Sequence, residues 1–136
     1  MAIPSTWKAA DGQPSGGFTA SDLLAVDGFH AAANVSTEPF VGDSYAYARA
    51  GELGLRHRSN VTVEGEREEI IDGDPTLIIE ARWTSPTPPA SSYRTMQVSL
   101  SSHGVGYVAT CAAATSAFER YRSMCESVVR SFAVER

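Results

Sequence analysis

An acidic run near the middle of the chain is the first candidate for chemistry. Glu64, Glu66 and Glu68 alternate along a stretch with strand character, so the two-residue period of a strand would place their carboxylates on one face. Repulsion between such carboxylates would raise their pKa values, as general acid–base catalysis requires. The alternative, which we favour, is a solvated strand face whose charges discourage pairing with another strand. Asp72 and Asp74 lack the further oxygen ligands of a calcium loop and predict a hairpin turn.

The histidines offer no obvious metal site. His30, His57 and His103 fall in three different segments, and none has a second ligand at the short spacings that zinc and iron sites use. The sequence contains no glycine-rich phosphate loop and no nucleophile elbow around a serine. We therefore expect no metal, no cofactor and no catalytic residues.

The two cysteines, Cys111 and Cys125, are candidates for a disulfide. The first ends a predicted strand, and the second faces inward from a predicted helix that covers this strand, so the geometry allows a bridge. Alternatively, both act as small buried apolar side chains. The redox state of the compartment decides between these two interpretations. A reactive pair of either cysteine with His103 is disfavoured, because a thiolate is unfavourable in an apolar core.

Aromatic and apolar side chains around the first predicted helix form the candidate partner-binding surface. Its members are Phe40, Tyr45, Tyr47 and Leu55, beside a stiff loop that contains Pro86 and Pro88. Gly51 and Gly54 interrupt this helix, so we expect it to cover the sheet incompletely and to leave a partly open groove. Aromatic side chains in such a groove typically engage helical or extended ligands. We expect the partner to bind here and not on the acidic run; the alternative is that these aromatic side chains only complete the core.

Composition is that of an ordinary globular protein. With 136 residues, 43% hydrophobic and 20% charged, the chain predicts a single domain over residues 1–136 that begins with an irregular segment over 1–17. A net charge of −5 disfavours binding to nucleic acid, which needs clustered Lys and Arg. No apolar run approaches the roughly 20 residues of a membrane span, and the N-terminus does not resemble a signal peptide. We expect a cytoplasmic protein if Met1 is the natural start, or an envelope or secreted protein if a leader has been removed.

The last third of the chain predicts a hairpin of two strands. Residues 93–100 alternate, with apolar side chains on one side only, as in a half-buried strand. His103 and Gly104 form the turn, because glycine accepts the positive φ that hairpin turns need. The chain then returns as a partner strand over 105–111.

A helix is expected to fold back over this hairpin. Ser116 is its predicted N-cap, and Glu119, three residues later, completes a capping-box pattern. Apolar side chains then recur at spacings of three and four, which is typical of a helix with one face on a core. These side chains are Phe118, Tyr121, Cys125, Val128 and Phe132.

The remainder of the chain predicts further strands and one more helix. The expected elements are a short strand around 23–26, a strand over 29–37, a helix over 43–55, and a hairpin with arms 61–71 and 76–83. Asp43 is the predicted N-cap of this helix. Because the first arm of the hairpin is charged and the second is apolar, we expect the first at an edge of the sheet and the second in its centre. Hairpins with two segregated helices indicate the α+β class, with a single antiparallel twisted sheet flanked by helices.

Four stretches carry a resemblance to a known family. They are Ile3-Pro4 with Trp7, Gly28-Phe29 with Ala33-Asn34-Val35, Ile71-Asp72-Gly73-Asp74-Pro75, and Ala117-Phe118-Glu119-Arg120-Tyr121 with Ser131-Phe132. Together they resemble the PsbP/DcrB-like superfamily, particularly its bacterial LpqN/LpqT-type and DcrB-related proteins. The resemblance implies an α/β/α sandwich around an antiparallel sheet. It also implies a non-enzymatic role, since known members are photosystem accessory proteins, envelope lipoproteins and chaperones of type VI secretion effectors.

Three functional hypotheses follow. The first is a non-catalytic protein-binding module, an adaptor or chaperone-like accessory protein for a secreted or assembling partner. The second is a carrier of a small molecule or lipid, with a pocket between sheet and helix. The third is an enzyme that uses the acidic run.

Overall fold

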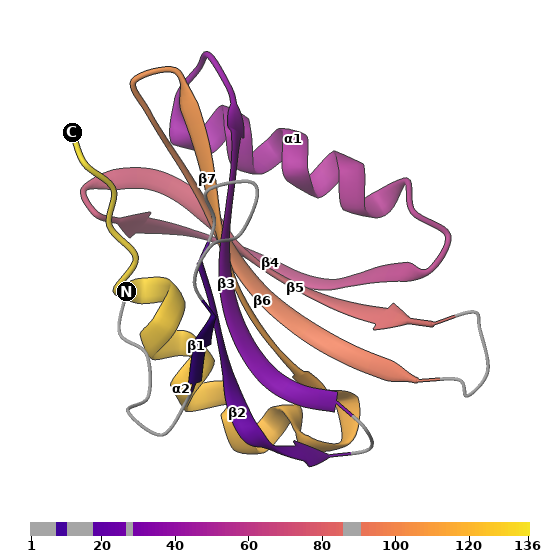
Figure 1. The fold of residues 1–136 in the computed structure, drawn as a ribbon. Coiled ribbons are helices and arrows are strands. Elements are labelled where there is room, and N and C mark those ends of the chain that lie inside the picture. Colours follow the sequence, from indigo (N-terminus) through magenta and orange to yellow (C-terminus); the bar gives the residue numbers. More distant parts are fainter. Residues whose placement is uncertain (1–7, 11–17, 27–28, 86–90) are drawn as a thin grey trace.

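One antiparallel sheet organises the molecule (Figure 1). The computed structural model describes residues 8–10, 18–26, 29–85 and 91–136. Within them the chain forms β1 (Lys8–Ala10), β2 (Phe18–Val26), β3 (Phe29–Pro39), α1 (Ser44–Arg56), β4 (Val61–Ile71), β5 (Asp74–Thr84), β6 (Ser92–Ser102), β7 (Val105–Ala114) and α2 (Phe118–Arg130). The seven strands follow the order β1-β2-β3-β7-β6-β5-β4, and every neighbouring pair is antiparallel.

The two helices lie on opposite faces of the sheet and give it three layers (Figure 1). Helix α1 packs on β4, β5 and β6, whereas α2 packs on β7, β6 and β3. The predicted α+β class, a single antiparallel sheet flanked by helices, is confirmed. The charged arm β4 lies at an edge and the apolar arm β5 lies inside the sheet, as the distribution of charges along the hairpin predicts.

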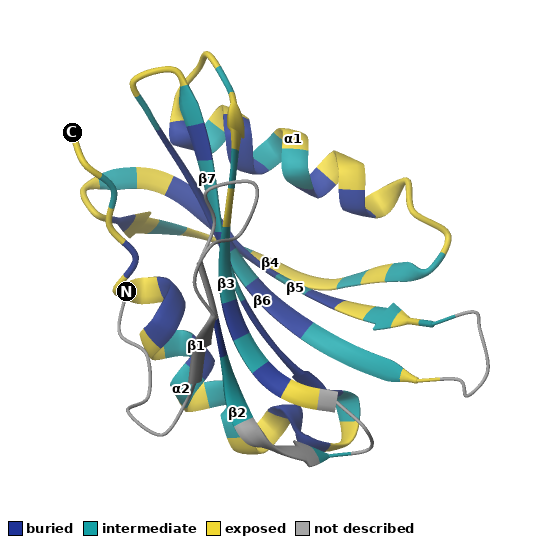
Figure 2. Ribbon diagram, viewed as in Figure 1, coloured by how far each residue is buried: buried dark blue, intermediate teal, exposed yellow. Residues whose placement is uncertain are grey.

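The larger part of the core lies between the sheet and α2. Figure 2 shows the buried residues along the middle of the strands and on the inner sides of both helices. Phe118, Val128 and Phe132 are buried as predicted, whereas Tyr121 is only half-buried and donates a hydrogen bond to Asp22 Oδ2 at 2.9 Å. A smaller cluster under α1 contains Ala48 and three larger apolar side chains: Leu55, Leu77 and Ile79.

Local signals for turns and caps were accurate at three places. Ala46 N donates to Asp43 Oδ1 at 2.7 Å, which confirms Asp43 as the N-cap of α1. The β4–β5 and β6–β7 hairpins close with two-residue turns in which both residues have positive φ, and Asp74, expected in the first of these turns, is instead the first residue of β5. The residues are Asp72 (52°), Gly73 (81°), His103 (52°) and Gly104 (78°). Glycine at the second position tolerates this conformation without the steric cost of a Cβ.

Four expectations were wrong in detail. Strand β1 lies in the segment that was predicted to be irregular, and β2 extends over nine residues rather than around 23–26 alone. A short 3₁₀ turn precedes α2, so the N-cap of that helix is Ala117 and not Ser116. Glu119 accordingly accepts from Arg122 and Arg94. The helix ends at Arg130, before Phe132.

Strand β6 is buried on both faces rather than on one. Met96, Val98 and Leu100 pack toward α2, as their alternation predicts. The intervening Thr95 and Ser99 are also buried, because α1 covers the opposite face of this strand. These hydroxyl side chains are small enough to be buried beneath the helix. A polar face on this strand therefore did not mean a face exposed to solvent.

Candidate functional site

The predicted partner-binding residues separate into core and surface. Tyr47 and Leu55 are only 5% and 7% exposed and belong to the packed interior, whereas Phe40 and Tyr45 are half-buried. Tyr47 donates a hydrogen bond to Glu38 Oε1 at 2.7 Å, and its ring centroid lies 4.7 Å from that of Phe40. Burial, followed by the hydrogen bond to Glu38, raises the pKa of Tyr47 above its usual value. Pro86 and Pro88 lie outside the described residues.

Tyr45 lines an open groove at one end of the sheet. The groove has a volume of about 540 Å³ and lies between the first turn of α1 and the β4–β5 hairpin. Its lining consists of Tyr45, Glu68, Glu69, Ile70, Pro75 and Thr76. Ile70 is 72% exposed although it is a large apolar residue. We call this feature the Tyr45 groove.

Arg49 fixes the Tyr45 side chain at the wall of the groove. The guanidinium donates to Tyr45 Oη from Nε at 3.1 Å and from Nη2 at 2.9 Å. Its Nη1 also donates to Glu52 at 2.9 Å and to Glu66 at 3.0 Å. Tyr45 Oη in turn donates to Glu68 Oε1 at 3.1 Å. The tyrosine is thus held between an arginine of α1 and a glutamate of β4.

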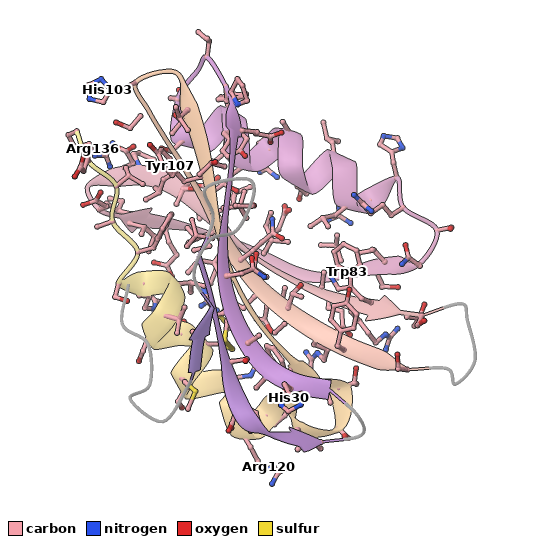
Figure 3. The ribbon with its side chains drawn as sticks, viewed as in Figure 1. His30, Trp83, His103, Tyr107, Arg120 and Arg136 are labelled. Carbon is pink, nitrogen blue, oxygen red and sulfur yellow. A yellow bond between two sulfur atoms is a disulfide. The ribbon has the colours of Figure 1, made fainter. Side chains whose placement is uncertain are left out.

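Hydrogen bonds hold the N-terminal end of α1 at the same end of the sheet. Ser101 N donates to Ser44 Oγ at 2.9 Å, and Ser44 Oγ donates to Asp74 Oδ2 at 2.7 Å. Arg136 Nη1 donates to the same carboxylate at 2.8 Å, which brings the C-terminal segment onto the β4–β5 turn (Figure 3). The Ser44 hydrogen bond and, after it, Arg136 lower the pKa of Asp74.

The acidic run does not form a shared carboxylate face. The pairing of β4 with β5 shifts by one residue between Val63 and Gly65, which is a β-bulge. Beyond it, Glu66 and Glu68 face α1, whereas Glu64 lies on the α2 side with its carboxylate 3.0 Å from Arg94 Nε. The prediction of one face was therefore wrong, because a bulge reverses the alternation that the sequence suggests. Most of these carboxylates also form ion pairs, which does not favour acid–base chemistry.

No metal site is evident among the described residues, where no three His, Cys, Asp or Glu side chains gather closely enough to hold an ion. His30 and His103 lie at opposite ends of the sheet (Figure 3).

The two cysteines are joined in a disulfide. Cys111 on β7 and Cys125 on α2 have Cα atoms 5.3 Å apart, and both residues are fully buried. The bridge therefore fastens α2 to the centre of the sheet. His103 projects from the far tip of the β6–β7 hairpin (Figure 3), so a thiol–histidine pair is ruled out.

Among the described residues, side chains occupy the space between the sheet and the helices. Under α1 the space is occupied by Leu55, Leu77 and Ile79, and under α2 by the disulfide and Phe118. The Tyr45 groove lies at the rim of the α1 layer. A second hollow, of about 420 Å³, lies where β3 ends and β7 begins. It is lined by Thr37, Glu38, Pro39, Gly104 and Val105.

Sequence reasoning found Tyr45 but missed its partners in the groove. Ile70 and Glu68 were interpreted only as parts of a charged arm. The available signal was an isoleucine pair, Ile70–Ile71, at the end of a strand predicted to lie at an edge, where one of the two must face outward.

Several solved structures share the fold of this chain. The chain matches none of the known protein families, and none of the curated protein sequences, to which it was compared. It is similar to PA94 of Pseudomonas aeruginosa, a protein of unknown function described as a candidate regulator, with a TM-score of 0.70, 14% identity, and coverage of 98% of this chain and 89% of that one.

Two further structures share the fold. LpqN, which is involved in cell envelope biogenesis of Mycobacterium tuberculosis, has a TM-score of 0.63 and 11% identity over 96% of this chain and 79% of LpqN. The PsbP protein of Synechocystis, CyanoP, has a TM-score of 0.55 and 12% identity over 98% of this chain and 84% of CyanoP. The chain therefore has the PsbP-like fold, as the sequence resemblance implies. In the described part of the chain, no helix is both long and apolar enough to pass through a bilayer.

Proposed function

We propose that this protein is a non-catalytic protein-binding module, an adaptor or chaperone-like accessory protein for a secreted or assembling partner. The observation that carries the proposal is the Tyr45 groove, which combines an exposed isoleucine, an aromatic ring held in place by Arg49, and an opening to solvent. Exposed apolar side chains beside a fixed aromatic ring are the usual anchors of protein interfaces.

The similar structures are compatible with this role. PA94 is described as a candidate regulator and LpqN as involved in cell envelope biogenesis, and none of the three similar structures is described as an enzyme. The Cys111–Cys125 disulfide supports a location in an oxidising compartment, because such bonds persist mainly outside the cytosol. We therefore favour the cell envelope over the cytoplasm.

A lipid carrier is the second candidate and has weaker support. Carriers usually enclose their ligand in an apolar cavity. Here the layers between sheet and helices are filled by Leu55, Leu77 and Ile79, and the Tyr45 groove has acidic residues on its walls. A buried acyl chain would need these side chains to move apart.

Purification from the native host distinguishes the two candidates. We expect a protein to remain bound in stoichiometric amount, identified by mass spectrometry of the purified complex. A retained lipid without a bound protein would favour the carrier instead.

Two tyrosine variants then test the site. We expect Tyr45→Ser to abolish partner binding with little change in melting temperature, because Tyr45 is half-buried in the groove wall. Tyr47→Ser should lower the melting temperature strongly, since it removes a buried ring and leaves Glu38 without its donor. Tyr45→Phe separates the two contributions of this side chain, since it keeps the ring and removes only the hydroxyl that Arg49 and Glu68 hold. Normal binding by Tyr45→Ser would show that the partner binds elsewhere.

A further inference from the structure

Strand β4 presents a long open edge beside the Tyr45 groove. It runs over eleven residues, from Val61 to Ile71, and in the described part of the sheet its single neighbour is β5. Half of the backbone N–H and C=O groups of an edge strand face outward without a strand partner. Such an edge can accept an additional strand from another chain, with main-chain hydrogen bonds supplying affinity and side chains supplying specificity.

The side chains along this edge indicate what such a strand would carry. Along the α1 face of β4 the side chains are, in order, Glu66, Glu68 and Ile70. Arg49 and Arg56 neutralise Glu66, at 3.0 and 3.7 Å. Glu68, by contrast, forms no ion pair with any described residue and accepts a hydrogen bond only from the uncharged Tyr45. Next to it, Ile70 is 72% exposed.

We propose that the outer edge of β4, from Glu68 to Ile71, takes an extended segment of the partner as an added strand. This segment carries a basic side chain beside Glu68 and an apolar side chain two positions away, beside Ile70. Opposite charges and apolar pairs directly across two strands are the pairs that stabilise sheets. The inference rests on the proposed protein-binding function and names the chemistry of the partner. It replaces the expectation that the partner avoids the acidic run, because Glu68 and Ile70 line the same groove as Tyr45.

A second copy of this chain fits the edge poorly. Antiparallel self-pairing that is centred on Arg67, Glu68 or Glu69 would place at least one glutamate directly opposite another. Like charges at such positions destabilise a sheet, and the net charge of −5 adds to the repulsion. These contacts disfavour a second copy at the edge, most strongly where two Glu68 carboxylates would meet, because Glu66 and Glu69 already pair with arginines. The edge therefore favours a basic foreign strand.

Synthetic peptides provide the test. The probe has nine residues, with threonine throughout except for one lysine and one valine two positions apart, and it is made in both orders to cover parallel and antiparallel addition. Binding is measured by titrating isotope-labelled full-length protein and following the backbone amide signals of residues 65–71. We expect saturable shifts on these residues, and an affinity about two- to fivefold lower when glutamate replaces the lysine, as for a single cross-strand charge pair.

Two controls make the result specific. Glu68→Gln should remove the preference for lysine over glutamate, whereas Glu119→Gln should keep it, because Glu119 is an exposed carboxylate on α2 that pairs with Arg94 and Arg122. Two further peptides carry N-methyl groups on alternate residues, one at the odd and one at the even positions. Only one of the two should fail to bind, because an added strand turns a single edge toward β4. Absence of saturable binding, or equal loss in both N-methylated peptides, would overturn the proposal.

The outcome also separates this proposal from the proposed function. The protein partner retained by the wild type is compared with that retained by Glu68→Arg. A partner that is lost from Glu68→Arg but kept by Glu119→Arg supports edge addition. A partner that both variants retain leaves the protein-binding function in place and overturns the edge proposal, whereas the absence of any bound protein overturns the function itself.

Discussion

Tyr47 shows how one residue can look like a binding residue in sequence and belong to the core in structure. Its ring lies against Gly106 of β7, where an added Cβ would overlap the ring atoms. Its hydroxyl reaches Glu38 on the neighbouring strand, so the side chain spans the gap between α1 and two strands. Tyr45, two positions earlier, faces the groove because residues two apart on a helix lie on different sides of it.

Gly106→Ala is expected to destabilise the protein by about 1–3 kcal/mol, as overpacked core sites generally do. The added methyl group would displace Tyr47 and with it the hydrogen bond to Glu38. Urea unfolding measures the change. Gly54→Ala is the matched control, since a Cβ there meets no atom within 4 Å and alanine favours a helix, so this variant should gain about 0.5–1 kcal/mol. A neutral Gly106→Ala would contradict the packing of Tyr47.

Asp74 is expected to contribute stability that depends on pH. Ser44 and Arg136 lower its pKa below the ordinary value of 3.8, so the folded state favours the ionised carboxylate. For a lowered pKa the contribution is fully present above the unfolded value and is lost as the pH falls through the folded value. The difference in free energy of unfolding between wild type and Asp74→Asn should therefore shrink below about pH 4. Urea unfolding between about pH 2 and 6 checks this, and Ser44→Ala should weaken the same pH dependence. A difference that is constant over this range would contradict the network.

Helix α2 and the hairpin beneath it were the easiest elements to predict. The stripe of Phe118, Cys125, Val128 and Phe132 has one consistent period and faces one sheet, so a simple pattern was sufficient. Strand β4 was harder, because the bulge between Val63 and Gly65 changes the face of every later residue. The isolated Gly65 is the one sequence signal for this bulge, and it was not interpreted as such. The candidate site depends on that bulge, since it places Glu68 and Ile70 on the α1 side. The sequence therefore predicted the layers and Tyr45, but not the wall that β4 contributes to the groove.

Phe132 provides a test of how α2 and its C-terminal end pack on the sheet. It is 5% exposed and lies just after the helix, against the core cluster under α2. Phe132→Ala should cost about 3–5 kcal/mol, as for buried aromatic residues generally. The midpoint of urea unfolding reports the effect. As a control, Ala133→Ser changes the exposed neighbouring residue and should leave the midpoint nearly unchanged.

At the scale of the whole molecule, ion pairs join both helices to the edge strand. Arg49 and Arg56 of α1 pair with Glu66, while Arg130 of α2 pairs with Glu69 at 2.8 Å. Side chains of β4 thus form ion pairs with the helices on both faces of the sheet, so most charges on this edge strand are compensated. Glu68 is the exception on which the proposal of an added strand rests, because its only described partner is the uncharged Tyr45.

The disulfide bears on both the stability of the molecule and its location. It closes a loop with a sequence separation of 14, so in the loop-entropy description it contributes on the order of 3 kcal/mol. If the protein matures in an oxidising compartment, as proposed, non-reducing mass measurement of protein from the native host should find the bridge intact. Reduction should then lower the melting temperature. The double variant Cys111→Ala/Cys125→Ala should be less stable than the wild type and insensitive to the reductant. Two free thiols in the native protein would instead favour the cytoplasm, with the two cysteines acting as small buried apolar side chains.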